Sequence, residues 1–346
     1  MSENSKIEWC HHTFNPWIGC TKVGPGCDNC YAEADFDKRR HVVQWGAGQP
    51  RKRTAMSTWA MPLRWNAKAE RLGVRYRVFC ASLADVFDNE VPAEWRHDLF
   101  DLIERTPHLD WLLVTKRIGN VRQMIPDRWS VCMPPNLWLG ITVVNQAEAD
   151  RDIPKLLGLK VSVRFLSMEP LLGPVDLRFH VFSEPTGNFR THAGKLQMEL
   201  RKPVDGGLHW VIVGGESGPG ARPMHPQWAR DLRDQCAEAG VPFLFKQWGE
   251  WAPGVCSDDP ECSVKHVFEG DARRVMSRVG KKHAGRLLDG AQHDGYPIQP
   301  PRVDASRKKA KCLRDLEFDN NLQGPCSAGQ CQFPDCVESP KGGDKE

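Results

Sequence analysis

Residues 137–144 read LWLGITVV, an apolar run of strand length with no charge in it. Similar runs recur at residues 13–20, 77–87, 110–117, 161–171, 209–217 and 242–250. The first of these is short and is the least clear. Nearly continuous apolar runs are typical of parallel strands that are buried on both faces. The pattern therefore predicts a parallel sheet of six to seven strands.

Helical periodicity lies between these runs. Residues 93–106 place apolar side chains three and four positions apart, which predicts an amphipathic helix. Residues 146–159 predict a second helix, which we expect Pro154 to interrupt, and residues 225–240 predict a third that stops at Gly240. Alternation of strand and helix indicates an α/β fold, here a complete or partial (βα) barrel.

The domain organisation follows from where this alternation ends. We expect one barrel domain over residues 1–297, with a polar insertion at about residues 180–208. Residues 298–346 are first basic and then rich in cysteine, glycine and proline, which predicts an appended tail with little core of its own.

The composition limits the compartment and the partners. The chain has 346 residues, a formal net charge of +3 and 40% hydrophobic residues. It contains no apolar run long enough for a membrane helix and no N-terminal secretory signal, so we expect a cytoplasmic protein without membrane contact. In a reducing cytosol the 13 cysteines are expected to bind metal or do chemistry rather than form disulfides.

The strongest functional signal is NPWIGCTKVGPGCDNCYAE, residues 15–33, in which Cys20, Cys27 and Cys30 have the spacing C-x6-C-x2-C. Thiolates are suited to iron–sulfur clusters or zinc. Three clustered cysteines leave one metal corner open for a small molecule. A structural zinc site remains the alternative, with Cys10, His11 or His12 as the fourth ligand, and a site without metal is the third interpretation.

The motif resembles the opening of radical S-adenosylmethionine enzymes, most closely the branch that includes spore photoproduct lyase. The resemblance rests on Asn15-Pro16-Trp17-x-Gly19-Cys20 and on the closing Cys30-Tyr31-Ala32. It implies a 4Fe–4S cluster on the three cysteines, S-adenosylmethionine bound at the open iron, and an electron donor such as flavodoxin or ferredoxin. The first gap holds six residues where the family usually has three.

A wider resemblance covers roughly residues 7–297. Segments such as LLVTKR, RFLSMEPLLGPVDL and VIVGGESGPGARPM are similar to a phage-associated three-cysteine-motif family whose reaction is unassigned.

Polar residues stand where the apolar runs end, which is the active-site side of a βα barrel. Together with Tyr31 of the motif, the residues expected to bind the cofactor are Ser82, Asp85, Lys116, Thr142, Glu169, Gly214, Gly215 and Glu216. Asp85 or Glu169 is expected to accept the methionine ammonium or the ribose hydroxyls, and Lys116 or Arg117 to pair with the carboxylate. The two glycines would let the cofactor approach the backbone. The alternative is a network of ordinary salt bridges around the rim.

Two further groups stand near the end of the chain. Lys281, Lys282 and Arg286 could hold phosphates or form a solvated helix face. The tail cysteines could bind zinc or a second cluster, or remain free thiols: Cys312, Cys326, Cys331 and Cys336.

The sequence thus predicts a radical S-adenosylmethionine enzyme, a lyase or transferase that generates a 5′-deoxyadenosyl radical and acts on a nucleic acid or a modified base. The alternatives are a non-catalytic zinc or iron–sulfur protein associated with phage, and a nucleic-acid-binding module in which the metal only shapes the fold.

Overall fold

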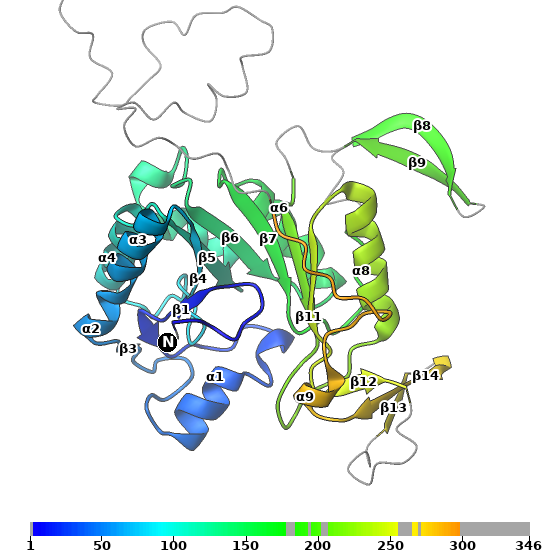
Figure 1. Cartoon of the computed structure of the whole chain (residues 1–346), viewed down its shortest axis with the longest axis horizontal. Helices are drawn as coiled ribbons and strands as arrows, with labels where there is room; N and C mark the ends of the chain where they lie inside the picture. Colours follow the sequence, from blue (N-terminus) through cyan, green and yellow to red (C-terminus); the bar gives the residue numbers. More distant parts are fainter. Residues whose placement is uncertain are drawn as a thin grey trace, which may run out of the picture. The chain divides into compact units, whose positions relative to one another are not determined.

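Seven parallel strands form one sheet in the computed structural model (Figure 1). In spatial order they are β1 (His12–Phe14), β4 (Tyr76–Cys80), β5 (Leu109–Thr115), β6 (Leu137–Thr142), β7 (Val163–Met168), β10 (Trp210–Gly214) and β11 (Phe243–Gln247). Each strand pairs with its neighbour in parallel register. Because β1 and β11 are the two edges of this described sheet, the barrel is open, and the prediction of a partial (βα) barrel is confirmed.

The structure describes residues 3–177, 184–192, 195–201, 207–254, 265–268 and 271–297, all within the unit Met1–Pro300. The tail cysteines lie outside these ranges.

The two faces of the sheet bury different cores, because successive side chains of a strand point to opposite faces. Leu113, Ile141 and Val213 belong to the larger core, which also holds residues of the surrounding helices. Trp138 and Trp210 belong to the second core, which the N-terminal segment fills with its own apolar side chains. Most tryptophans are buried in one of these cores.

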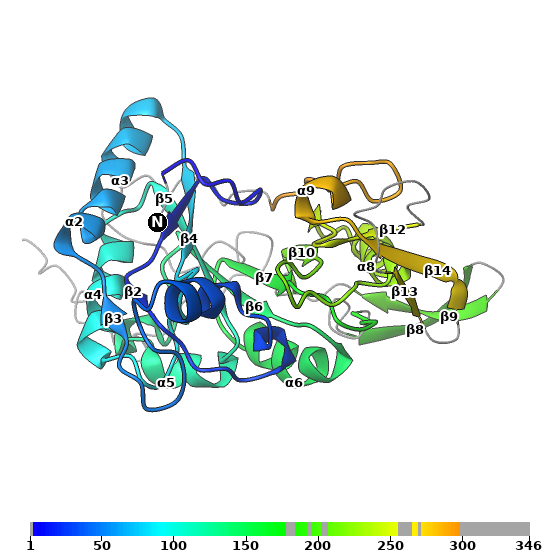
Figure 2. The ribbon, with the colours of Figure 1, turned by 90° about the horizontal axis from the view of Figure 1, so that it is seen from below.

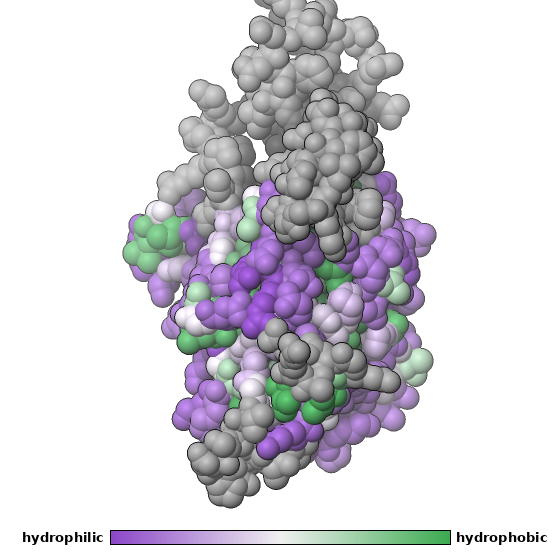
Figure 3. Space-filling model, turned by 90° about the vertical axis from the view of Figure 1, so that its right-hand side faces the viewer, coloured by the Kyte–Doolittle hydropathy of each residue, from purple (hydrophilic) through white to green (hydrophobic). Residues whose placement is uncertain are grey.

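The helices that flank the sheet are α2 (Met56–Trp59), α3 (Met61–Leu72), α4 (Ala93–Glu104), α5 (Val121–Met124), α6 (Gln146–Leu157) and α8 (Pro226–Ala239) (Figures 1 and 2). The expected interruption at Pro154 is wrong, because α6 continues through it. Helix α8 ends as predicted, with Gly240 in the left-handed conformation at φ 65°. The side of the molecule that carries α8 is largely hydrophilic (Figure 3).

Smaller elements complete the described part. They are the antiparallel pairs β2 (Trp17–Ile18) with β3 (Lys52–Arg53) and β8 (Glu184–His192) with β9 (Lys195–Arg201), the small sheet of β12 (Trp251–Pro253), β14 (Asp271–Arg278) and β13 (Lys265–Phe268), and the short helices α1 (Tyr31–Glu33) and α9 (Lys281–Ala284). A π-helix, η2 (Ala34–Arg39), continues α1. No helix in the described ranges is both long and apolar enough to cross a bilayer.

Candidate functional site

The three cysteines lie on one loop, residues 20–30, which covers the carboxyl ends of neighbouring strands. A β-carbon on Gly26 of this loop would lie 2.8 Å from Cγ1 of Val144, 3.5 Å from Cε of Lys116 and 4.0 Å from Cγ2 of Thr142. Lys116 directly follows β5, whereas Thr142 ends β6. The fold therefore brings the cysteine loop onto the edge of the sheet where a βα barrel binds its ligands.

Arg117 holds the first end of this loop. Its Nη1 lies 3.5 Å from Sγ of Cys20, and its Nη2 donates to the carbonyl oxygen of Thr21 at 2.6 Å. Asp85 lies 3.1 Å from Nη1 and also accepts from the Thr115 hydroxyl at 2.8 Å and the Lys116 amide at 3.0 Å. Asp85 therefore orients Arg117 and is already surrounded by donors from the chain.

A second buried arginine extends the network. The side chain of Arg51 is 0% exposed, and its Nη2 lies 2.7 Å from Asp88, 3.0 Å from Glu90 and 2.7 Å from the hydroxyl of Thr21. Asp88 in turn lies 3.7 Å from Nη2 of Arg117. Buried charges need such partners, because an unpaired charge in the interior is costly.

Arg222 holds the other end of the loop. Its guanidinium pairs with Asp28 at 3.0 Å and donates to the carbonyl oxygen of Pro25 at 2.8 Å. It also pairs with Glu216, 2.7 Å away, and Glu216 accepts from the amide of Asn29 at 3.0 Å. Burial opposes the charged form of Glu216, but the hydrogen bonds from Arg222 and Asn29 outweigh it and lower the pKa of this carboxyl group. Glu216 thus serves to fasten the loop to the segment after β10.

The three sulfurs are free and partly buried. Cys20 and Cys30 pack against the same small cluster, which includes Trp45 and Leu83. Burial, together with nearby Asp85, raises the pKa of Cys20 to about 12 despite Arg117. Within the described residues, no three His, Cys, Asp or Glu side chains are gathered closely enough to hold a metal ion. The three sulfurs would therefore have to be drawn together to bind one.

The residues considered as a fourth zinc ligand have other contacts, near the amino end of β1. Nδ1 of His11 accepts from the backbone amide of Arg77 at 2.8 Å, and Nδ1 of His12 accepts from the amide of Asn4 at 3.2 Å. Cys10 is buried in the second core. None of these arrangements points to a zinc site shared with the loop.

Tyr31 connects the loop to the end of β4. Its hydroxyl donates to the carbonyl oxygen of Ser82, while its side chain remains exposed. The Ser82 hydroxyl is held by Asn15, whose amide nitrogen lies 3.0 Å away. Asn15 Oδ1 also accepts from the amide of Leu83 at 2.8 Å, so it ties the Asn-Pro segment to the chain after β4. Asn15 belongs to the motif that carries the resemblance, but the motif alone does not predict this structural role.

An ion pair stands at the ends of β7 and β11. Nζ of Lys246 lies 3.0 Å from Oε1 of Glu169, and Ser167 is 3.3 Å from the other carboxylate oxygen. Burial works against the charge on Lys246, but the effect of Glu169 outweighs it and raises the pKa of the lysine, which favours its charged form. A β-carbon on Gly214 would lie 3.1 Å from Oε1 of Glu169.

Gly215 makes a different close approach. A β-carbon there would lie 1.9 Å from the carbonyl oxygen of Trp248, so the space beside it is filled by the chain itself.

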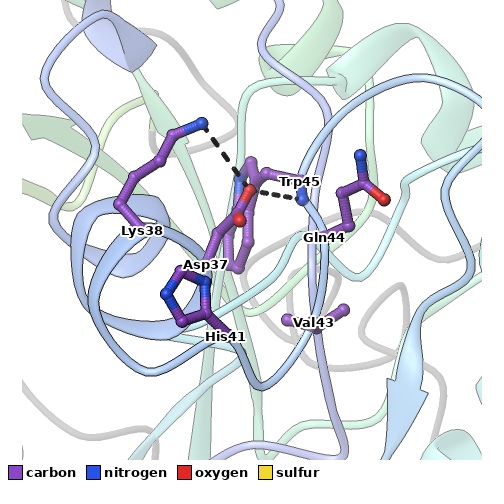
Figure 4. Close-up of a pocket in the computed structure, with 6 residues that line it drawn as sticks. All are labelled: Asp37, Lys38, His41, Val43, Gln44 and Trp45. Atoms are coloured by element: carbon purple, nitrogen blue, oxygen red, sulfur yellow. Dashed lines mark hydrogen bonds and ion pairs between the residues drawn. The ribbon is translucent and has the colours of Figure 1, made fainter.

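A cavity of about 320 Å³ lies within the segment that follows the cysteine loop (Figure 4). It is lined by Asp37, Lys38, His41, Val43, Gln44 and Trp45. Asp37 accepts from the backbone amide of Trp45 at 2.8 Å and lies 3.9 Å from Lys38. The residues predicted to bind the cofactor do not line this cavity.

The structure thus brings the predicted residues to one edge of the sheet in several groups. Arg222 and Asn29 were missed, because no local pattern marks a residue that meets the loop from far away in the sequence. Lys281 and Lys282 are exposed and begin α9. Trp248 directly follows β11, and its backbone amide donates to the carbonyl oxygen of Gly285 at 3.1 Å. Because Gly285 directly follows α9, this hydrogen bond joins α9 to the segment after β11.

Comparison with known proteins gives a family and two remote structural neighbours. A cysteine-to-serine mutant of spore photoproduct lyase is similar over 82% of this chain and 73% of its own, with 11% identity and a TM-score of 0.39. A double mutant of the same enzyme, with bound AdoMet and dinucleoside spore photoproduct, is similar over 80% of this chain and 70% of its own, with 10% identity and a TM-score of 0.37. No curated protein matches the chain. The model of the family described as "Protein of unknown function (DUF5131)" matches residues 4–297, and the chain therefore belongs to the DUF5131 family.

Proposed function

We propose that this protein is a radical S-adenosylmethionine enzyme whose cysteine loop binds a 4Fe–4S cluster through Cys20, Cys27 and Cys30. The observation that carries the proposal is the position of this loop, with its three free thiols, over the carboxyl ends of the strands of an open (βα) barrel. Cysteine thiolates are the ligands that such clusters require, and a set of three leaves one iron without a protein ligand.

Two features of the chain suit a 4Fe–4S cluster: the three cysteine sulfurs as ligands, and the contacts that anchor the cysteine loop. Arg117 holds the loop beside Cys20, and Arg222 holds it on either side of Cys27, at Pro25 and Asp28. Metal binding commonly organises ligands that are not gathered beforehand. When bound and reduced, the cluster supplies the electron that cleaves S-adenosylmethionine to methionine and a 5′-deoxyadenosyl radical.

The chain's own residues would bind and orient the cofactor. Glu169 and Lys246 offer a carboxylate and an ammonium at the end of the strands, which complement the ammonium and carboxylate of the methionine portion. Asp85 and Glu216 are taken up by the two arginine networks and would act through the loop rather than on the cofactor.

The proposed substrate is a nucleic acid or a modified base. Lys281 and Lys282 support this part, because they are exposed on a helix joined by a backbone hydrogen bond to the segment after β11, and lysines there can contact phosphates. A flavodoxin or ferredoxin is the proposed electron donor. The phage association and the cytoplasmic location stay predictions.

Anaerobic purification and reconstitution test the proposal. We expect about four irons and four sulfides per chain by the cluster's formula, and 5′-deoxyadenosine on addition of dithionite and S-adenosylmethionine. Cys27→Ala should lose the iron, whereas Cys236→Ala, which changes a buried cysteine of the larger core, should keep it. Zinc without iron in the wild type, or full iron in Cys27→Ala, would contradict the proposal.

A further inference from the structure

A charged donor lies against one of the three thiols. Nη1 of Arg117 is 3.5 Å from Sγ of Cys20, while Nη2 donates to the carbonyl oxygen of the next residue, Thr21, at 2.6 Å. One planar guanidinium therefore contacts both a sulfur and the backbone at the point where the loop begins. A lysine could not reproduce this fork, because it presents a single ammonium.

Two carboxylates hold the guanidinium of Arg117 in place. Its side chain is 8% exposed, and it lies 3.1 Å from Asp85 and 3.7 Å from Asp88. Asp85 is itself held by the Thr115 hydroxyl and a backbone amide. Because these contacts restrict the side chain of Arg117, its Nη1 donor stays oriented toward the Cys20 sulfur.

The opposite end of the loop provides a natural comparison. Arg222 is also ion-paired and also donates to a loop carbonyl, that of Pro25. Its contacts in the described part of the chain go to oxygen atoms of Asp28, Pro25 and Glu216 and to no sulfur. The two arginines thus share the task of holding the loop but differ in contact with a thiol.

We propose that Arg117 is a positioning residue that fixes the first end of the cysteine loop and, through its contact with the Cys20 sulfur, raises the reduction potential of the cluster. The inference rests on the proposed function. Reduction adds negative charge to the cluster, so a cationic donor on a ligating sulfur stabilises the reduced form more than the oxidised form. Loss of Arg117 therefore lowers the potential more than loss of Arg222, which contacts no sulfur.

The first test compares Arg117→Gln, Arg117→Lys and Arg222→Gln in the full chain, reconstituted with iron and sulfide and titrated under anaerobic conditions. For Arg117→Gln we expect at least a tenfold fall in the equilibrium constant of one-electron reduction, equal to about 59 mV. Arg117→Lys should fall less because it keeps a positive charge, and Arg222→Gln should fall less because Arg222 contacts no sulfur. An unchanged potential in Arg117→Gln, or an equal fall in both glutamine variants, would overturn the proposal.

The second test needs no metal and separates this proposal from the function on which it rests. Hydrogen exchange of the metal-free chain should quicken at residues 20–22 in Arg117→Gln and at residues 26–28 in Arg222→Gln. Unchanged exchange at residues 20–22 would overturn the positioning role, whether or not the wild type takes up iron. A wild type that binds no iron would instead contradict the proposed function.

Arg117→Gln leaves a buried carboxylate without its main partner, so its folding is checked by circular dichroism. If that variant is unfolded, the double variant Arg117→Gln/Asp85→Asn, compared with Asp85→Asn alone, carries both tests, because it removes the unpaired charge.

Discussion

Replacing Gly215 with alanine should open the site edge between β10 and β11. The added carbon would lie 1.9 Å from the carbonyl oxygen of Trp248 and 2.5 Å from its carbonyl carbon, both backbone atoms. Since such contacts are essentially never shorter than 3.0 Å, the two segments must separate by about 1 Å. The movement also strains the hydrogen bond from the Gly215 amide to the carbonyl oxygen of Gln247, which is 2.9 Å long.

The expected cost follows from these two effects. Overpacking that displaces backbone costs about 1–3 kcal/mol, and the weakened hydrogen bond adds about 1 kcal/mol. We therefore expect Gly215→Ala to lose about 3 kcal/mol of unfolding free energy. For a chain of this size that corresponds to a fall in Tm of about 4 °C.

The assay is urea and thermal unfolding followed by circular dichroism. Gly119→Ala is the matched control, because a β-carbon on Gly119 would meet nothing within 4 Å, and it should stay within about 0.5 kcal/mol of the wild type. Wild-type stability in Gly215→Ala would refute the steric reasoning. If that stable variant also failed to bind S-adenosylmethionine, the glycine would instead be required for the ligand, as the sequence had suggested.

Three other changes test separate parts of the structure. Burial lowers the pKa of His209 to about 4, so the unfolded chain takes up the proton first as the pH falls. About 3 kcal/mol of stability, present above pH 6.5, should therefore be lost as the pH falls toward 4. Urea midpoints measured against pH should show a smaller loss in His209→Gln, and an identical profile would contradict this. Arg51→Met should cost about 3–5 kcal/mol in chemical denaturation, because it leaves the buried Asp88 without its 2.7 Å partner; a neutral effect would show that the network contributes no net stability. If nucleic acid binds near α9, the double variant Lys281→Glu/Lys282→Glu should bind an oligonucleotide more weakly in fluorescence anisotropy. The slope of the logarithm of the binding constant against the logarithm of the salt concentration should become shallower by about one unit per lost phosphate contact. An unchanged slope would place the nucleic acid elsewhere.

The positions of the strands could be predicted from the sequence, but their exact ends could not. Each of the seven apolar runs overlaps a strand of the parallel sheet and extends beyond its carboxyl end. Strand β7, for example, ends at Met168, before Glu169. Residues past the strand ends are those of the candidate site. The predicted interruption of α6 at Pro154 was wrong, because a proline inside a helix removes one hydrogen bond but does not always end the helix.

The sequence by itself determined the order of strands and helices and the cysteine loop, because apolar periodicity and residue spacing are local properties of the chain. Only the tertiary structure decided what holds that loop. Arg117 meets Cys20 across 97 positions, and Arg222 meets Asp28 across 194. Such contacts depend on how the strands are placed beside one another, and no spacing within a short segment encodes that placement.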